Sequence, residues 1–129
     1  MIVIDSSMAV DFLVAAKTEA GVVNVMSAED VLIAPFLIDL EVMNVLRKRV
    51  LGRQMSQADA NRSFRALGNL RLIRYPIEPL AARIWQLLFN MTPYDAAYVA
   101  LAEALALPLY TRDGRLSRSV RHQADIRLV

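Results

Sequence analysis

The sequence predicts a three-layer α/β/α fold, in which a central, mostly parallel β-sheet lies between two layers of helices, as in Rossmann-like domains. Two features favour this fold. Short runs of branched apolar residues, typical of buried parallel strands, alternate with longer segments of helical periodicity, and capping residues, glycine or proline separate the segments. The chain has 129 residues, 56% of them hydrophobic, so we expect a single domain over 1–129 with its own core.

The first half of the chain is expected to contain two strands and four helices. In chain order, these are a strand at 2–4, a helix capped by Ser6 or Ser7 that turns Val10, Leu13 and Val14 inward, a helix over about 19–28, a strand at 31–33, a helix from Pro35 to about Leu51, and a helix from Ser56 to about Leu67. Gly52 and the pair Gly68–Asn69 are expected to end the last two helices.

The second half is expected to contain three strands and three helices. In chain order, these are a strand at 70–74 that ends before Pro76, a helix over 80–89, a helix from Thr92 to about Leu105, a strand at 109–111, a short helix after Gly114 and an edge strand at 125–129. The start at Thr92 is well marked, because a capping threonine precedes Pro93 at the first helical position and Asp95 at the third.

Composition excludes several kinds of site. The chain has no cysteine, which excludes disulfides and zinc–thiolate centres and favours a reducing compartment, the cytoplasm. His122 is the one histidine, which excludes a two-histidine ribonuclease mechanism. The four glycines match no nucleotide-binding fingerprint, and Ser6–Ser7 has no partner pattern for acyl transfer. Neither a signal peptide nor a membrane-spanning run of about 20 apolar residues is recognisable, so no membrane association is expected.

Charge is unevenly distributed, although the net charge is only +2. Residues 1–41 contain seven acids and one base, whereas 47–74 contain eight bases and one acid. Thirteen of the fifteen bases are arginine, whose planar fork suits phosphate. A basic surface beside an acidic cluster would suit an enzyme acting on nucleic acid, with Arg49, Arg53 and Arg65 as candidate contacts. A merely solvated basic face is the alternative.

Four acidic residues are expected at the edge of the sheet where the parallel strands have their carboxyl ends. Asp5 directly follows the first strand, and Asp113 comes two residues after the strand at 109–111. Glu41 lies in the first two turns of the helix after the second strand, and Asp95 lies in the first turn of its helix. Ligands of such sheets bind at this edge, near the point where the strand order reverses. We therefore expect the four carboxylates to face one crevice.

Each of these acids also has a purely structural interpretation. Asp95 completes a T-x-x-D capping box with Thr92, and Asp113 is a typical turn residue. Asp5 can cap a helix, and Glu41 can pair with bases on an exposed helix face. If all four roles were structural, the chain would be a non-catalytic α/β binding module.

A metal-dependent phosphatase of another class is a further alternative at the same edge of the sheet. Such an enzyme is expected to carry a D-x-D acid pair after the first strand. Here Ser7 stands two residues after Asp5, where the second acid would be.

Clustered carboxylates raise each other's pKa unless a cation compensates them. Hard divalent cations prefer oxygen ligands, so Mg²⁺ or Mn²⁺ is the expected cofactor. One or two such ions can activate water and stabilise the leaving oxygen of a phosphodiester. The acids and the basic stretch together therefore predict a metal-dependent nuclease.

Four segments resemble the motifs of PIN-domain nucleases. They are Ile4–Ser7, Glu41–Arg47, Tyr94–Ala102 and Leu109–Asp113, which are similar to the family's D-x-S opening, E-x-x-N-x-L-R helix, third-acid helix, and fourth-acid strand and turn. The resemblance covers nearly the whole chain, and the order and spacing of the segments agree. At this length, the chain resembles VapC-type toxins of toxin–antitoxin pairs.

The resemblance implies a PIN-like fold and a Mg²⁺- or Mn²⁺-dependent endoribonuclease. Asp5, Glu41, Asp95 and Asp113 would be the catalytic acids and the metal ligands. The substrate would be RNA, cut by a metal-activated water.

Other parts of the machinery are implied in the same way. Ser7 and Thr111 would orient carboxylates, and Asn44, one turn after Glu41, would assist from the same side of its helix. The family also implies a homodimer and a cognate VapB-type antitoxin that occludes the site. Asp11 and Asp39 match no motif position and are expected to be peripheral.

Overall fold

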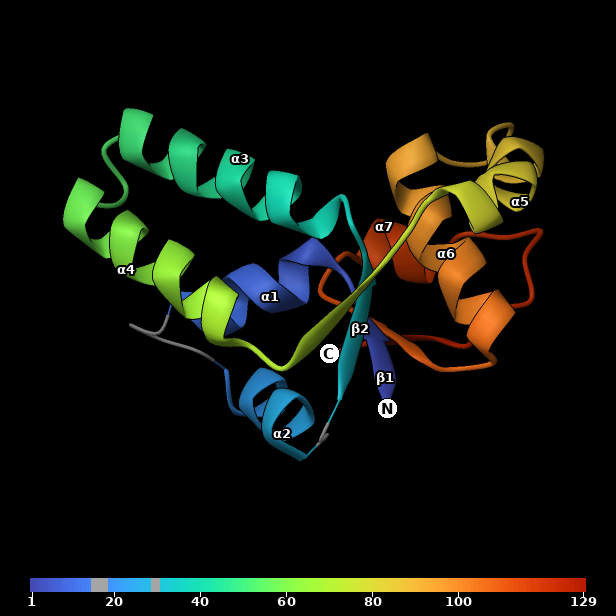
Figure 1. Cartoon of the computed structure of the whole chain (residues 1–129), viewed down its shortest axis with the longest axis horizontal. Coiled ribbons are helices and arrows are strands. Elements are labelled where there is room, and N and C mark those ends of the chain that lie inside the picture. Colours follow the sequence, from blue (N-terminus) through green and yellow to red (C-terminus); the bar gives the residue numbers. More distant parts are fainter. Residues whose placement is uncertain (15–18, 29–30) are drawn as a thin grey trace.

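The computed structural model describes residues 1–14, 19–28 and 31–129, and these residues form one five-stranded sheet (Figure 1). The strands are β1 (Ile2–Ile4), β2 (Leu32–Pro35), β3 (Leu72–Tyr75), β4 (Leu109–Thr111) and β5 (Ile126–Leu128). Every neighbouring pair is parallel, and the order is β3-β2-β1-β4-β5. The predictions of a parallel sheet and of an edge strand within 125–129 are confirmed.

Helices cover both faces of the sheet. They are α1 (Ser6–Leu13), α2 (Ala20–Ala28), α3 (Ile38–Leu51), α4 (Gln57–Asn69), the 3₁₀-helix η1 (Glu78–Leu80), α5 (Ala81–Leu87), α6 (Pro93–Leu105) and α7 (Gly114–Ser117). In Figure 1, α1 to α4 lie on one side of the sheet, and α5 and α6 lie on the other. The predicted three-layer α/β/α architecture is confirmed.

The strand order reverses between β1 and β4. The connections from β1 to β2 and from β2 to β3 run through α1 to α4, whereas the connection from β3 to β4 returns through α5 and α6 on the opposite face. In open α/β sheets, ligands bind beyond the carboxyl ends of the strands at such a reversal. Residues that directly follow β1 and β4 are therefore placed where a ligand would bind.

The strand β1 and the helix α6 lie at the centre of the core. Ile2, Val3 and Ile4 are each at most 2% exposed, and so is every residue from 96 to 102. The middle of α6, from Ala96 to Ala102, is buried all round because it packs against β1, β2 and β4 on one side and against α5 on the other. This packing holds the first turn of α6 beside the end of β1.

We expected Pro35 to open a helix, and this expectation is wrong. Pro35 ends β2, and α3 begins only at Ile38. Pro35 lies opposite Tyr75 of β3, and the next residue, Phe36, donates its N–H to the Tyr75 carbonyl at 2.9 Å. Because N–H groups alternate in direction along a strand, the missing N–H of Pro35 faces β1, whose pairing with β2 ends at Ile33. Proline is tolerated there because it removes no hydrogen bond of the ladder.

Two predicted helix boundaries are wrong. The cap of α1 is Asp5 rather than Ser6 or Ser7, and its side chain accepts the N–H of Met8. The helix α4 continues through Gly68 to Asn69 instead of ending at Leu67. No glycine among the described residues has a positive φ, so Gly68 does not provide the left-handed stop that we expected of it.

The remaining differences are shifts within predicted elements. The strand expected at 70–74 is β3, which begins at Leu72, and the helix expected over 80–89 is α5, which spans 81–87 and is preceded by η1. Among the described residues, no helix has the length and apolar character needed to cross a bilayer.

Candidate active site

Asp5 lies at the carboxyl end of β1 and is 5% exposed. Its Oδ1 accepts the Ser7 hydroxyl at 2.6 Å and the Met8 N–H at 3.1 Å, and its Oδ2 accepts the hydroxyl of Thr111 at the end of β4. Burial raises the pKa of Asp5, and these hydrogen bonds act in the opposite direction. The carboxylate is therefore held in one orientation by β1, α1 and β4 together.

The hydroxyls of Ser7 and Thr111 connect Asp5 to the turn after β4. Ser7 Oγ accepts the N–H of Arg112 at 2.8 Å, and Thr111 Oγ1 accepts the N–H of Asp113 at 2.8 Å. Each hydroxyl thus uses its proton on Asp5 and a lone pair on the backbone. These are the positions that the sequence suggested for residues that orient carboxylates, and they tie the turn that carries Asp113 to Asp5.

Glu41 lies in the first turn of α3 and is half-buried. Its Oε1 accepts the hydroxyl of Tyr98 from α6 at 2.7 Å, so residues from opposite layers of the fold meet at this point. Burial raises the pKa of Glu41, and the nearby charges of Asp5 and Asp95 raise it further, while hydrogen bonds from Tyr98 and Ser6 lower it. Burial and Glu41 also raise the pKa of Tyr98, so Tyr98 remains a hydrogen-bond donor.

Asp95 and Asp113 each stand at the start of a helix. Asp95 is in the first turn of α6, where its N–H is bonded to Thr92 Oγ1 at 3.2 Å. Asp113 is the N-cap of α7, and its Oδ1 accepts the N–H groups of Arg115 at 2.7 Å and Leu116 at 3.4 Å. Asp113 therefore has a structural role, as a helix cap rather than as the turn residue that the sequence suggested, and this role uses Oδ1, whereas Oδ2 lies 3.5 Å from a guanidinium nitrogen of Arg115.

Arg115 is a cation that touches this group of acids. One of its guanidinium nitrogens lies 3.8 Å from Asp95 Oδ2 and 3.5 Å from Asp113 Oδ2, and its side chain is 76% exposed. Burial raises the pKa of Asp95 and the charge of Asp113 adds to this, whereas Arg115 and a hydrogen bond to Thr92 lower it. The positive charge of Arg115 thus offsets part of the repulsion between the two carboxylates.

Asp5, Glu41, Asp95 and Asp113, which we call the acidic site, form a chain of electrostatic neighbours. The charges of Asp5 and Asp95 raise the pKa of Glu41, and the charge of Asp113 raises the pKa of Asp95. The four residues come from four separate segments of the sequence, and they meet at the reversal point of the sheet. Mutual repulsion at such a place favours the binding of a positive ion.

The donors of the acidic site suit a hard divalent cation, because all of them are carboxylate oxygens. Among residues 1–14, 19–28 and 31–129, no three histidine or acidic side chains lie close enough together to enclose a cation as they stand. Glu41 and Asp95 are only half-buried, so their side chains have room to adjust, while Asp5 is fixed.

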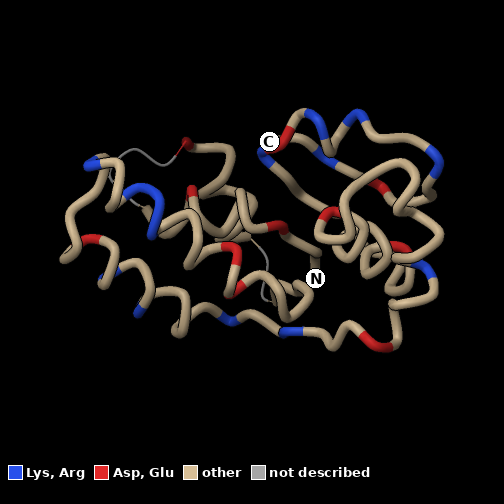
Figure 2. Tube along the Cα trace, turned by 90° about the horizontal axis from the view of Figure 1, so that it is seen from above, with Lys and Arg blue, Asp and Glu red and all other residues tan. Residues whose placement is uncertain are grey.

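The other candidate residues lie outside the acidic site. Asn44 is exposed on α3, three residues after Glu41. Arg53 and Arg65 are exposed and Arg49 is half-buried; they belong to the α3–α4 hairpin or its turn. In Figure 2, basic positions line the outer edge of this hairpin, and acidic positions gather toward the middle of the molecule.

The two acids expected to be peripheral are bound to arginines. Asp39 accepts hydrogen bonds from Nε and from a second guanidinium nitrogen of Arg74, at 2.6 and 2.8 Å. Asp11 pairs with Arg112 at 2.9 Å, and the same guanidinium also binds Glu19 and the carbonyl of Val129. These carboxylates stabilise the scaffold around the acidic site.

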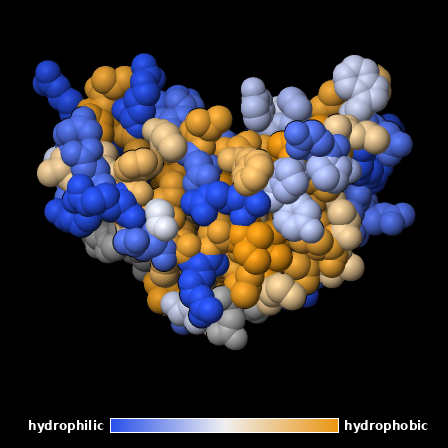
Figure 3. All heavy atoms as spheres, in the orientation of Figure 1, coloured by the Kyte–Doolittle hydropathy of each residue, from blue (hydrophilic) through white to orange (hydrophobic). Residues whose placement is uncertain are grey.

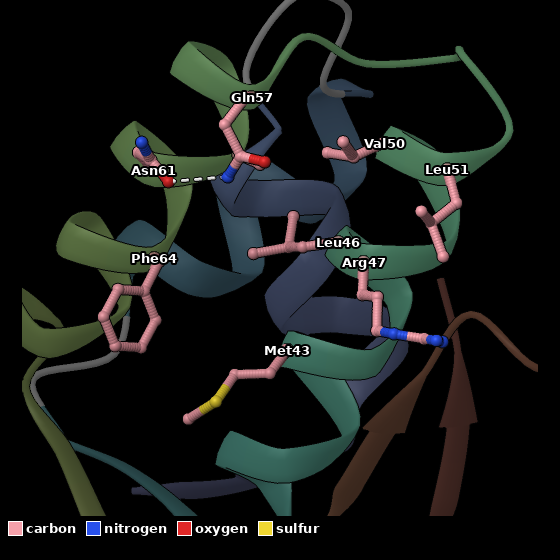
Figure 4. Close-up of a pocket in the computed structure, with 9 residues that line it drawn as sticks. Met43, Leu46, Arg47, Val50, Leu51, Gln57, Asn61 and Phe64 are labelled. Atoms are coloured by element: carbon pink, nitrogen blue, oxygen red, sulfur yellow. Dashed lines mark hydrogen bonds between the residues drawn. The ribbon is translucent and has the colours of Figure 1, made fainter.

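A separate hollow of about 380 Å³ lies between α3 and α4, away from the four carboxylates. Figure 4 shows Met43, Leu46 and Phe64 lining it, together with Arg47 and the hydrogen-bonded pair Gln57–Asn61. Its lining is mostly apolar and contains no acidic residue, so it offers no ligands for a metal ion.

Sequence reasoning missed Tyr98 and Arg115 as residues of the site. Tyr98 could have been found, because it lies three residues after Asp95 and therefore on the same face of α6. Arg115 has no comparable signal, since its position depends on how α7 is oriented after Asp113.

Comparison with known proteins relates the chain to a family of known fold. The family model described as "PIN domain" matches residues 2–121. Ribonuclease VapC1 of Mycobacterium tuberculosis is 41% identical over 128 residues, which cover 98% of this chain and 96% of the relative. Ribonuclease VapC12 of the same species is 38% identical over 129 residues, which cover 100% and 99%.

Two solved structures share the fold. The crystal structure of Mycobacterium tuberculosis VapC20, described as a sarcin-ricin loop cleaving toxin, has a TM-score of 0.69 at 16% identity and covers 91% of this chain and 93% of its own. A protein from Pyrobaculum aerophilum has a TM-score of 0.68 at 25% identity and covers 90% and 83%. At such low identity, the structural likeness supports the fold rather than the activity.

Proposed function

The chain belongs to the PIN domain family as a VapC-type ribonuclease of a toxin–antitoxin system, and we propose that its acidic site holds the divalent cation, Mg²⁺ or Mn²⁺, with which it cuts RNA. VapC-type ribonucleases with a PIN domain depend in general on divalent metal. The identity of the ion and the assignment of Asp5, Glu41, Asp95 and Asp113 as its ligands are our proposal.

The observation that carries this proposal is the convergence of four carboxylates with little positive charge to compensate them. They meet at the carboxyl ends of β1 and β4, where the strand order reverses. Three of them have a raised pKa, and Arg115, the arginine that borders them in the described part of the chain, lies 3.8 Å from Asp95 and 3.5 Å from Asp113. Purely structural carboxylates are expected to have closer cationic partners.

The residues around the acidic site have distinct tasks in this proposal. Asp5 is the rigid ligand, because three hydrogen bonds fix its carboxylate. Tyr98 orients Glu41 by donating its hydroxyl, and Ser7 and Thr111 hold Asp5 and the turn of Asp113 in register. When bound, the divalent cation supplies the charge that activates a water and stabilises the leaving oxygen of a phosphodiester.

The basic residues of 47–74 are proposed to hold the RNA backbone. Arg49, Arg53 and Arg65 come from one hairpin, and Arg53 and Arg65 are exposed. Contacts between arginine and phosphate are independent of base sequence and weaken with salt. Such contacts would bring RNA to the acidic site without selecting a sequence.

A VapB-type antitoxin is proposed as the protein partner. Arg115 shows that a guanidinium group fits between Asp95 and Asp113, so an arginine of the partner could occupy the same place and exclude metal. Copurification of the product of the neighbouring gene should abolish RNA cleavage, and a complex with full cleavage activity would contradict this role.

A homodimer is proposed from the apolar side chains that the single chain leaves exposed. Phe36, Leu40 and Ile73 are 54%, 69% and 49% exposed and belong to the neighbouring segments β2, α3 and β3 or their junctions. The space-filling view shows apolar surface across the middle of one face of the molecule (Figure 3). Surfaces of this kind mark contacts with other chains.

The experiment that tests the function is end-group analysis of the cleavage products with Mg²⁺ or Mn²⁺ and with EDTA. A metal-activated water that attacks the phosphorus in line leaves a 5′-phosphate and a 3′-hydroxyl, and the 2′-hydroxyl takes no part. Cyclic phosphate ends, or full cleavage in EDTA, would contradict the proposal.

The alternative functions lack support. The position that a D-x-D phosphatase would use is occupied by Ser7, which bonds Asp5 instead of supplying a second acid. The relatives named above are ribonucleases, and neither a phosphatase nor a non-catalytic module is favoured.

A further inference from the structure

Arg115 lies against the acidic site but is bound to it loosely. Its guanidinium is 3.8 Å from Asp95 and 3.5 Å from Asp113, and three-quarters of its side chain is exposed. By contrast, Arg74 donates two hydrogen bonds to Asp39, at 2.6 and 2.8 Å, and its side chain is only 26% exposed. Arg115 therefore has the position of a counter-ion without the geometry of a permanent ion pair.

The main chain of Arg115 is anchored, whereas its side chain is mostly exposed. Its N–H is bonded to Asp113 Oδ1 at 2.7 Å as part of the cap of α7. Next to it, a hollow of about 140 Å³ lies between the start of α6 and α7, with Asn90, Thr92 and Ser119 among its lining residues. Arg115 and Asp95 both border this hollow, so the guanidinium can leave the carboxylates and remain beside the site.

A movable cation beside the acidic site would ease the approach of RNA. RNA is a polyanion, and its phosphates must approach four carboxylates that repel them. A guanidinium beside Asp95 and Asp113 would be repelled once those two residues shared a divalent cation, and it would then be free to bind a phosphate. Arginine suits both partners, because its planar fork fits carboxylate and phosphate equally well.

We propose that Arg115 is a substrate-binding residue with two positions: it is the counter-ion of Asp95 and Asp113 in the metal-free protein, and it holds a phosphate of the RNA once these residues have bound the divalent cation. The inference rests on the proposed function and adds to it a specific interaction with the substrate. It also makes Arg115 a competitor of the metal ion, because the two cannot share the same carboxylate oxygens.

The test compares Arg115→Ala with Arg115→Lys and with Arg118→Ala. Arg118 is the C-cap residue of α7, is exposed, and has no ion pair within the described part of the chain, so it is the matched control. Three quantities are measured for each protein: the affinity for Mn²⁺ without RNA, the values of kcat and KM for a fluorescent RNA, and the affinity for RNA in EDTA. Thermal melting in EDTA confirms that each variant is folded.

Arg115→Ala should bind Mn²⁺ more tightly than the wild type and should raise KM by about tenfold, as expected when one charge-assisted hydrogen bond to the substrate is removed. Its affinity for RNA in EDTA should hardly change, because Arg115 is engaged with the carboxylates under that condition. Arg115→Lys should raise KM less than Arg115→Ala does. Arg118→Ala should match the wild type in all three measurements.

Three results would overturn the inference. Tighter Mn²⁺ binding with unchanged KM would make Arg115 a counter-ion alone, no change in either quantity would make it a surface residue, and weaker Mn²⁺ binding would make it a support of the metal ligands. If the wild type cut no RNA, the proposed function would fail separately. RNA affinity in Mn²⁺ against EDTA would then decide, because the wild type and Arg118→Ala should gain more affinity from the ion than Arg115→Ala.

Discussion

Carboxylates outside the acidic site bind arginine at short distances, whereas those of the acidic site accept mainly hydroxyl and backbone N–H groups and lie near one another. Asp39 accepts two guanidinium nitrogens of Arg74 at 2.6 and 2.8 Å, and Glu103 accepts two of Arg83 at 2.7 and 3.0 Å. Glu41 instead accepts a tyrosine hydroxyl at 2.7 Å. The same chemical group thus has two kinds of environment within one small fold.

The pKa of Glu103 and the pKa values of three acids of the acidic site are shifted in opposite directions. The hydrogen bond from Arg83 lowers the pKa of Glu103, whereas burial raises the pKa of Asp5, Glu41 and Asp95. Thirteen arginines are present in the chain, so the weak compensation of the acidic site does not reflect a shortage of cations. This difference is the basis of our proposal that the site receives a positive charge from outside.

The largest expected effect concerns RNA cleavage. Asp95→Asn should reduce the cleavage rate by more than about 100-fold, since substitution of residues that merely hydrogen-bond a metal ligand already reduces activity by about 10–100-fold. Asp39→Asn removes the same charge from the peripheral group and should cost about 1 kcal/mol of stability while it leaves cleavage nearly normal. Comparable rates for the two variants would abolish the distinction between the two groups of carboxylates.

Asp5→Asn should also stop cleavage, but with a loss of stability that Asp95→Asn does not show. Both oxygens of Asp5 accept hydrogen bonds, and Ser7 and Thr111 each donate their hydroxyl proton to Asp5 and accept one backbone N–H. An amide group must turn its NH₂ toward one of these donors, which costs about 1–3 kcal/mol. The measurement is urea unfolding in EDTA, and equal stability of Asp5→Asn and the wild type would contradict the hydrogen-bond arrangement.

A smaller effect is expected from arginines that are not engaged with carboxylates. Replacement of Arg49, Arg53 and Arg65 by alanine should reduce the slope of log affinity against log salt by about 0.7 for each arginine that binds a phosphate of single-stranded RNA. Arg83→Ala is the control, because Glu103 holds its guanidinium. An unchanged slope in the triple variant would mean that these arginines are only solvated or serve a protein interface.

The smallest expected effect is a difference in pH dependence without metal. Glu41 has a raised pKa, so its contribution to stability is present below the ordinary value of 4.5 and is lost as the pH rises through the raised value. Glu103 has a lowered pKa, so its contribution is present above 4.5 and is lost as the pH falls through the lowered value. We therefore consider the melting temperature of each variant in EDTA minus that of the wild type at the same pH. This difference should rise with pH for Glu41→Gln and fall with pH for Glu103→Gln. Parallel profiles would refute the contrast.

Features with local signals were predictable from the sequence. The apolar run Ile2–Ile4 and the Thr92–Pro93 helix start each depend on a few adjacent residues, and with them the places of Asp5 and Asp95 on strand ends and helix starts could be predicted. The topology rule for parallel sheets then predicted that the acids converge.

Features that depend on distant partners were not predictable in this way. Pro35 remains in β2 because Tyr75 of another strand pairs with it, and Tyr98 reaches Glu41 across 57 positions of sequence. Arg115 approaches Asp95 only because α7 turns back toward α6. Each of these contacts is made by tertiary packing, which overrides or adds to local preference.

The most direct test of a metal site built from these carboxylates is the shift of melting temperature on addition of Mn²⁺, measured for the wild type and for Asp95→Asn. An ion that binds the folded chain stabilises it by about 2.7 kcal/mol at 100 times its Kd, which raises the melting temperature of a domain of this size by several degrees. We expect this rise in the wild type, its loss in Asp95→Asn, and a melting temperature of Asp95→Asn in EDTA that equals or exceeds that of the wild type, because a like-charge repulsion is relieved. An equal Mn²⁺-dependent rise in both proteins, or a lowered melting temperature of Asp95→Asn with near-normal cleavage, would make Asp95 a helix-capping residue and contradict the proposed site.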